Sequence, residues 1–254
     1  MTNATGRPSI LFPLFAGLET LEGIGEKTAR HLLQLGVERP RDLLFTLPYA
    51  VVDRRLRPSL RDMALPAVAT VEVTVGAHLA PLRKGGPTRV MVRDAGLEFQ
   101  LVFFHARGDS LQKQMPVGQR RVVSGKVELF DGMAQMVHPD HILRPEEAAR
   151  LPEWEPVYPL TAGITQRLMA KAAQGAIARA PLLAEWADPA LVAREGWPCW
   201  HEAVRAAHAP RSTDDLGQSA PARRRLAYDE LFAHQLTLSI ARSRMRLRAA
   251  FRSR

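Results

Sequence analysis

The pattern of apolar and polar positions along the chain first predicts helices. In residues 1–62, "GEKTARHLLQLGV" places Ala29, Leu32 and Leu33 at helical spacing, and Gly36 follows as a helix stop. The segment "RPRDLLFTLP" predicts a second short helix that Pro48 ends. We therefore expect residues 1–62 to form an N-terminal helical region with a glycine-containing turn.

Residues 63–145 change to the alternating pattern of β-strands. Three runs, "VATVEVTVGAHLA", "TRVMVRDA" and "LEFQLVFFH", precede "ARGDSLQKQMPVGQ", which is long enough for a short helix. Two more runs follow in "RRVVSGKVELFDGMAQMVHPDHIL", where Asp131–Gly132 is a strong hairpin signal. Three strands, a helix and two strands is the order of an OB-fold, a small barrel often used for oligonucleotides. The alternative is another small β-barrel without a ligand.

The remaining residues again read as helical. Residues 146–222 form a predicted helical connector, with Thr161 or Thr165 as a helix cap in "VYPLTAGITQRLM". Residues 223–254 read as one long helix, in which Leu231, Leu238 and Met245 lie on an apolar packing seam. The predicted fold class is therefore α+β, with a helical region, a five-stranded OB-fold barrel, a helical connector and a long C-terminal helix that ends without a stop signal, as at a cut.

Charge is concentrated at the C-terminal end of the chain. The formal net charge is +9, and residues 221–254 hold nine arginines against Asp229 and Glu230, a balance of +7. Such a basic segment usually meets phosphates or acidic partners, although it can also be a solvated helix face. The single cysteine, Cys199, excludes an internal disulfide and favours the cytosol. No secretory signal or apolar run of about 18 residues is present, so we expect no membrane partner.

The stretch "GIGEKT" invites comparison with a phosphate-binding loop of an ATPase. That loop needs Gly-Lys-Ser/Thr after an upstream glycine and a buried strand, whereas here Glu26 separates Gly25 from Lys27. This spacing excludes the interpretation of "GIGEKT" as an ATP-binding loop. It fits a helix-hairpin-helix-like turn, whose backbone N–H groups approach a DNA phosphate. The candidate contacts are Gly23, Gly25, Lys27 and Thr28; the alternative is a purely structural turn.

Aromatic residues at the end of the third predicted strand are the best candidates for contact with bases. Neighbours on a strand face opposite sides, so one of Phe103 and Phe104 should fill the core and the other can stack on a base. Both could also be core. The accompanying candidates are His105, Arg107, Lys113 and Lys126, with Phe130 on the next hairpin. The segment "HPDH" lacks further ligands at metal spacing, and we identify no metal site and no catalytic group in this chain.

Together these segments resemble the N-terminal part of the RecG family of ATP-dependent DNA helicases. The resemblance covers nearly the whole chain in order: "LEGIGEKTARHLLQLGV", "DLLFTLP", "DRR", "FFH", "VSGKVE", "MVHPDH", "VYPLT" and "LAYDELFAHQL". The last two are the most specific. Phe104, or alternatively Phe103, matches the aromatic of the family's wedge, but Gly108 stands where some members have a second aromatic.

The resemblance implies a role in DNA repair and recombination. It implies that the barrel is a wedge that binds and splits branched DNA, such as replication forks and four-way (Holliday) junctions, as a cytoplasmic, nucleoid-associated monomer. It also implies that ATP and magnesium belong to motor lobes absent from this chain, which alone should lack ATPase activity. The rival hypothesis is a stand-alone junction-binding or RNA-binding OB-fold module without a motor.

Overall fold

The computed structural model describes residues 6–81, 83, 85–104 and 108–252, and it divides the chain into two compact units. One unit is Met1–Val51 together with Pro156–Arg254, and the other is Val52–Glu155. The chain passes between them twice, along the paired strands β1 (Ala50–Asp53) and β9 (Trp154–Val157). The barrel unit is longer at both ends than the range 63–145 predicted from the sequence, because short strands flank the alternating segments.

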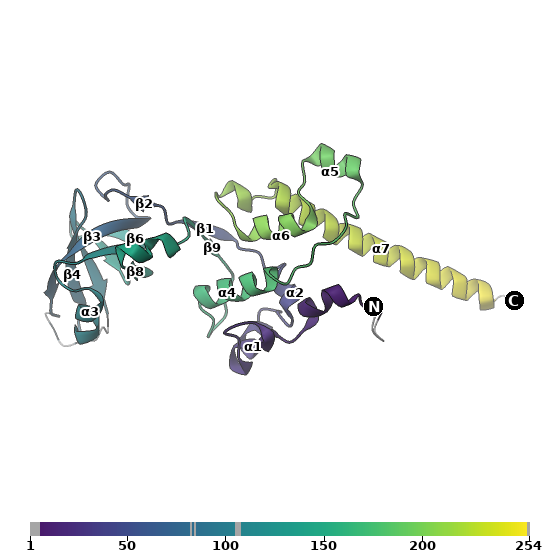
Figure 1. Cartoon of the computed structure of the whole chain (residues 1–254), viewed down its shortest axis with the longest axis horizontal. Coiled ribbons are helices and arrows are strands. Elements are labelled where there is room, and N and C mark those ends of the chain that lie inside the picture. Colours follow the sequence, from purple (N-terminus) through teal and green to yellow (C-terminus); the bar gives the residue numbers. More distant parts are fainter. Residues whose placement is uncertain (1–5, 82, 84, 105–107, 253–254) are drawn as a thin grey trace. The chain divides into compact units, whose positions relative to one another are not determined.

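The discontinuous unit is helical (Figure 1). Its elements are η1 (Ser9–Phe15), η2 (Leu18–Thr20), α1 (Glu26–Leu33), α2 (Pro40–Leu43), α4 (Gln166–Ile177), α5 (Pro189–Glu195), α6 (Trp200–His208), η4 (Asp214–Leu216) and α7 (Pro221–Arg252). Leu32 and Leu43 share one buried cluster with Met169, Ala173 and Val204. The predicted N-terminal region and helical connector are thus two halves of one hydrophobic core.

Local sequence signals fix the ends of the helices as expected. Gly36 adopts φ +75° soon after α1, a backbone conformation that glycine tolerates without steric cost. At the start of α4 the Thr165 hydroxyl oxygen accepts a hydrogen bond from the Leu168 N–H at 3.2 Å. Thr165, and not Thr161, is therefore the cap.

A buried polar chain joins the two halves of this unit. The Tyr158 hydroxyl lies 3.0 Å from His208 Nδ1, and His208 Nε2 lies 3.0 Å from the Leu44 carbonyl oxygen. Because the carbonyl only accepts, Nε2 carries the proton and Nδ1 accepts from the tyrosine. Burial lowers the pKa of His208, so the imidazole is held neutral.

The long helix α7 is anchored near its beginning. The guanidinium of fully buried Arg225 donates to both Glu185 carboxylate oxygens at 2.7 and 2.8 Å and to Asp229 at 2.9 Å. These Arg225 hydrogen bonds lower the pKa of Glu185 to about 2. Two residues of the apolar seam predicted further along α7, Leu231 and Met245, are 65% and 63% exposed, whereas Leu238 between them is half-buried.

The barrel unit contains the predicted strands and two additional short ones. Its elements are β2 (Leu56–Arg57), β3 (Ala67–Leu79), β4 (Thr88–Arg93), β5 (Glu98–Phe103), α3 (Gly108–Gln114), β6 (Arg120–Phe130), β7 (Met133–Val137), β8 (His141–Leu143) and η3 (Pro145–Arg150). The sheet order is β2-β3-β4-β5-β7-β6-β8, and a further pairing of β3 with β6 closes the barrel. The pairs β2–β3 and β5–β7 are parallel, and the other pairs of this sheet are antiparallel.

This topology confirms the predicted OB-fold barrel and its helix after the third strand. Alternate residues of the five barrel strands, such as Val71, Val90, Leu101, Val123 and Met136, are fully buried in one cluster. The opposite set of side chains forms the outer face of the barrel.

Candidate nucleic-acid interface

The two aromatic residues predicted to contact bases have different environments. Phe103, the last residue of β5, belongs to the buried barrel cluster and is 9% exposed. Phe104 follows it outside the strand and is 43% exposed. The alternative that both residues are core therefore does not hold, and Phe104 is the residue available for stacking.

His138 holds Phe104 from the neighbouring strand end. It follows β7 with φ +46°, and its Nε2 accepts a hydrogen bond from the Phe104 N–H at 3.2 Å. The two rings lie 5.8 Å apart in a tilted arrangement, while Phe103 meets the same imidazole edge-on at 6.2 Å. This contact was not predictable from the sequence, because it depends on the parallel pairing of β5 with β7.

The acidic and second histidine residues of the "HPDH" segment lie in an ion-pair cluster with Arg54 and Glu155. Asp140 pairs with the buried guanidinium of Arg54 at 2.8 Å, and Arg54 also pairs with Glu155 at 2.8 Å. His141 lies 3.6 Å from the Glu155 carboxylate, and the hydrogen bond from His141, followed by the charge of Arg54, lowers the pKa of Glu155. Within the described part of the chain, no group of three or more potential ligands could hold a metal ion.

The predicted cationic contacts are only partly defined. Lys113 on α3 and Lys126 on β6 are exposed, and Lys126 lies 3.9 Å from Glu128. His105 and Arg107 lie outside the described residues. Phe130 is paired with Met133 beside the β6–β7 turn, and the register places it at the opposite end of the strands from Phe104.

The glycine turn before α1 is braced against α4. Gly23 has φ +82°, and the neighbouring Glu22 carboxylate pairs with Lys171 of α4 at 2.7 Å, a hydrogen bond that lowers the pKa of Glu22. The element before the turn is the three-residue η2, so only the second helix of the expected hairpin is an α-helix. Lys27 is exposed and Thr28 half-buried, and their contact with DNA stays a prediction.

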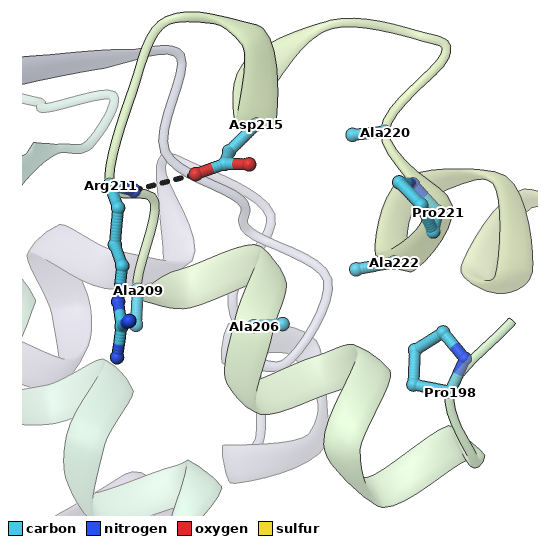
Figure 2. Close-up of a pocket in the computed structure, with 8 residues that line it drawn as sticks. All are labelled: Pro198, Ala206, Ala209, Arg211, Asp215, Ala220, Pro221 and Ala222. Carbon is cyan, nitrogen blue, oxygen red and sulfur yellow. Dashed lines mark hydrogen bonds between the residues drawn. The ribbon is translucent and has the colours of Figure 1, made fainter. Parts of the chain in front are cut away.

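A hollow of about 370 Å³ lies in the helical unit between α6 and the start of α7 (Figure 2). Small apolar residues dominate its lining, including Ala206, Ala220 and Pro221. Its one carboxylate, Asp215, accepts the Arg211 backbone N–H at 2.7 Å. This arrangement closes a loop and offers no group suited to a reaction.

The closed five-stranded barrel, with its helix between the third and fourth barrel strands, defines the barrel unit as an OB-fold. The chain belongs to the RecG wedge domain family, whose pattern matches residues 18–179. Among curated relatives, the ATP-dependent DNA helicase RecG of Pasteurella multocida is 29% identical over 234 residues, 89% of this chain and 33% of the relative.

Two further relatives agree. The RecG helicase of Escherichia coli K12 is 28% identical over 89% of this chain and 33% of its own length. The solved structure of RecG bound to a three-way DNA junction matches with a TM-score of 0.69 and 25% identity, over 90% of this chain and 31% of that chain. The chain thus spans about a third of the length of the relatives it matches. No helix of the described residues is long and apolar enough to cross a membrane.

Proposed function

We propose that this chain is the branched-DNA-binding wedge region of a RecG-like, ATP-dependent DNA helicase that remodels forks and junctions in DNA repair. The observation that carries the proposal is Phe104, an exposed aromatic ring held by His138 at the end of an OB-fold barrel. The similarity of the whole chain to a RecG structure bound to a three-way DNA junction supports the same assignment.

In this proposal Phe104 stacks on the base that is uncovered where two DNA arms separate. Stacking on one aromatic contributes about 1–3 kcal/mol. Separation of one base-pair step costs roughly 1.4 kcal/mol of stacking. The two terms are comparable, so a single wedge residue can hold one step open but cannot drive many steps apart. Continuous remodelling requires ATP, magnesium and motor lobes, which we assign to the part of the relatives that this chain does not match.

The backbone of the DNA is contacted without regard to sequence. Arg242, Arg244 and Arg246 are exposed on α7, and Lys113 and Lys126 are exposed on the barrel unit. Cations at phosphates release counterions, which makes such binding salt-dependent. We expect a cytoplasmic, nucleoid-associated monomer.

The test compares labelled DNAs of equal length by fluorescence anisotropy at several salt concentrations. The 254-residue chain should bind a fork and a four-way junction more tightly than a blunt duplex, and every affinity should fall as salt rises. Equal affinity for fork and duplex would exclude the wedge role. A tRNA competitor that displaces the fork as well as unlabelled fork does would instead favour an RNA-binding OB-fold module.

A further inference from the structure

We infer that the buried Arg54 is a positioning residue for Phe104 and that it acts through the loop 138–140. The inference rests on the proposed function, in which Phe104 meets the branch. Arg54 pairs with Asp140 at one end of this loop, and His138 at the other end accepts the Phe104 N–H. The loop therefore joins the buried guanidinium to the exposed aromatic residue.

Arg54 is the centre of a polar cluster at the point where the chain enters the barrel unit. It directly follows β1 and is 7% exposed. Its Nε donates to Glu155 at 2.8 Å, its Nη1 donates to the Ser124 hydroxyl at 3.0 Å, and its Nη2 pairs with Asp140 at 2.8 Å. A planar guanidinium that donates in three directions has a defined orientation, unlike the point charge of a lysine. Each partner is therefore held in place relative to the others.

The three partners of Arg54 belong to separate segments of the chain. Ser124 is fully buried within β6, and its hydroxyl lies 2.6 Å from the Thr70 hydroxyl of β3. Glu155 lies in β9, by which the chain leaves the barrel unit. Asp140 lies between β7 and β8, outside the strands. Of the three partners, Asp140 is thus the one whose position depends most on the guanidinium.

The loop 138–140 is short and strained at its first residue. His138 has φ +46°, in the left-handed region that is costly for a residue with a side chain. Such a conformation persists only where the surrounding structure imposes it. The backbone N–H of His138 donates to the Val102 carbonyl oxygen of β5 at 2.9 Å. This bond fixes the first residue of the loop only, so a further constraint is needed after it.

The second half of the loop is held by close approach to β6 and by the ion pair. A Cβ atom at Gly125 would lie 3.2 Å from the Pro139 Cα, so the glycine lets the loop lie directly against the strand. Asp140 follows Pro139 and pairs with Arg54. Since one residue separates Asp140 from His138, a backbone rotation that moves one of them also moves the other.

This arrangement predicts what Phe104 loses when the ion pair is removed. Without the pair, the loop can relax from the left-handed conformation of His138, and the imidazole moves with the backbone. Phe104 then loses the acceptor of its N–H and the ring that lies 5.8 Å from its own. An aromatic side chain that is not held loses more entropy on stacking. Base stacking therefore weakens, while contacts with phosphates do not change.

A purely structural role of Arg54 predicts a different result. Removal of either carboxylate would then destabilise the barrel and leave the fork preference of the folded chain unchanged. Asp140 and Glu155 each pair with the guanidinium at 2.8 Å, but only Asp140 belongs to the loop. Comparison of these two carboxylates therefore separates positioning from stability.

The first experiment compares Asp140→Ala with Glu155→Ala in the 254-residue chain without DNA. Arg54 is kept, because its removal would deprive both carboxylates of their partner and threaten the fold. NMR measures the exchange of the Phe104 N–H with solvent. Asp140→Ala should raise this rate by about two- to tenfold, the equivalent of one net hydrogen bond, and Glu155→Ala should not change it. Asp140→Asn, which keeps an oxygen acceptor, should restore much of the protection.

The second experiment titrates the same variants with fork and duplex DNA. Asp140→Ala should lower fork affinity by about two- to tenfold and leave duplex affinity unchanged. Its effect should not add to that of His138→Ala in the double variant, because Asp140 acts through His138. Glu155→Ala should keep the wild-type ratio of duplex to fork dissociation constants, even if its melting temperature falls.

Failure of the inference and failure of the proposed function give different results. An exchange rate of the Phe104 N–H that is unchanged in Asp140→Ala, or equally raised in Glu155→Ala, would overturn the inference. Additive losses of fork affinity from His138→Ala and Asp140→Ala would overturn it as well. A wild-type chain without preference for forks would instead overturn the proposed function, while the exchange rates, which involve no DNA, would still decide whether Arg54 positions Phe104.

Discussion

Phe104 depends on a neighbour that its own strand does not supply. Its backbone N–H is fixed by His138 Nε2 at 3.2 Å, and the imidazole lies against the phenyl ring. An exposed aromatic can stack productively only if its orientation is held, since ordering a free side chain costs entropy. In the proposed function, His138 is thus a positioning residue for Phe104.

Replacement of His138 tests this dependence. We expect His138→Ala to lower fork affinity by about two- to tenfold, the equivalent of one net hydrogen bond, while duplex affinity stays unchanged. Anisotropy titrations of both DNAs measure the difference, and His234→Ala, which removes an exposed histidine on α7, is the control. An equal loss on fork and duplex would show that His138 acts only through general stability.

The buried pair of Tyr158 and His208 makes the stability of the helical unit depend on pH. Burial lowers the pKa of His208 in the folded state below its ordinary value of about 6.5. The unfolded chain therefore binds a proton that the folded chain does not. The neutral His208 contributes fully to the free energy of unfolding at pH values above the pKa that this histidine has in the unfolded chain. This contribution is lost as pH falls below about 6.5. Thermal melting between about pH 8 and pH 5 should show this loss, and a flat profile would contradict it.

The same pair predicts the effect of removing one hydroxyl. Tyr158→Phe leaves the buried Nδ1 of His208 without a donor, and we expect a loss of about 1–3 kcal/mol in the free energy of unfolding. Urea titration measures it. Tyr49→Phe is the matched control, because Tyr49 is 67% exposed and should lose nothing. Equal stability of the two variants would mean that the hydrogen bond contributes little.

Among the elements, the turn before α1 has two roles that can be separated. Its contact with α4 through Glu22 and Lys171 is structural, whereas Lys27 is exposed and free to meet a phosphate. If Lys27 contacts a DNA phosphate, Lys27→Ala should weaken fork and duplex binding alike. It should also reduce the slope of log affinity against log salt concentration by about 1. Arg194→Ala on α5 is the control. An unchanged slope would leave the turn with its structural role alone.

The elements themselves were largely predictable from local pattern. Alternation identified the five barrel strands, Asp131–Gly132 identified their last hairpin, and periodicity identified α1. These signals are local, because each depends on residues within a few positions of one another. The contact of His138 with Phe104 was not predictable, since it joins residues separated by 34 positions and requires a positive φ at a non-glycine residue.

The seam expected along α7 shows another limit of such patterns. Leu231 and Met245 have the spacing of a packed face, yet both are exposed in this structure. Spacing reports which residues share a face of a helix but not whether that face has a partner. The anchoring of α7 depends instead on Arg225, whose charge conceals its complete burial from a sequence pattern.

At the scale of the whole molecule, the barrel is an insertion in the helical unit. Residues from both sides of the insertion, such as Leu43 and Ala172, share one core. Apolar periodicity shows that each segment has a buried face but not which distant segment covers it. The prediction from the sequence therefore treated residues 1–62 and 146–222 as separate regions. In physical terms, the core of the helical unit is complete only when the segments on both sides of the barrel pack together.

The central claim is that this chain recognises a DNA branch through Phe104. The most direct test measures the ratio of duplex to fork dissociation constants for the wild-type chain and for Phe104→Ala at one salt concentration. We expect the substitution to reduce this ratio by about fivefold or more, the equivalent of one stacked base, while salt-dependent duplex binding persists. A Phe104→Ala chain that keeps the full wild-type preference for forks would contradict the account.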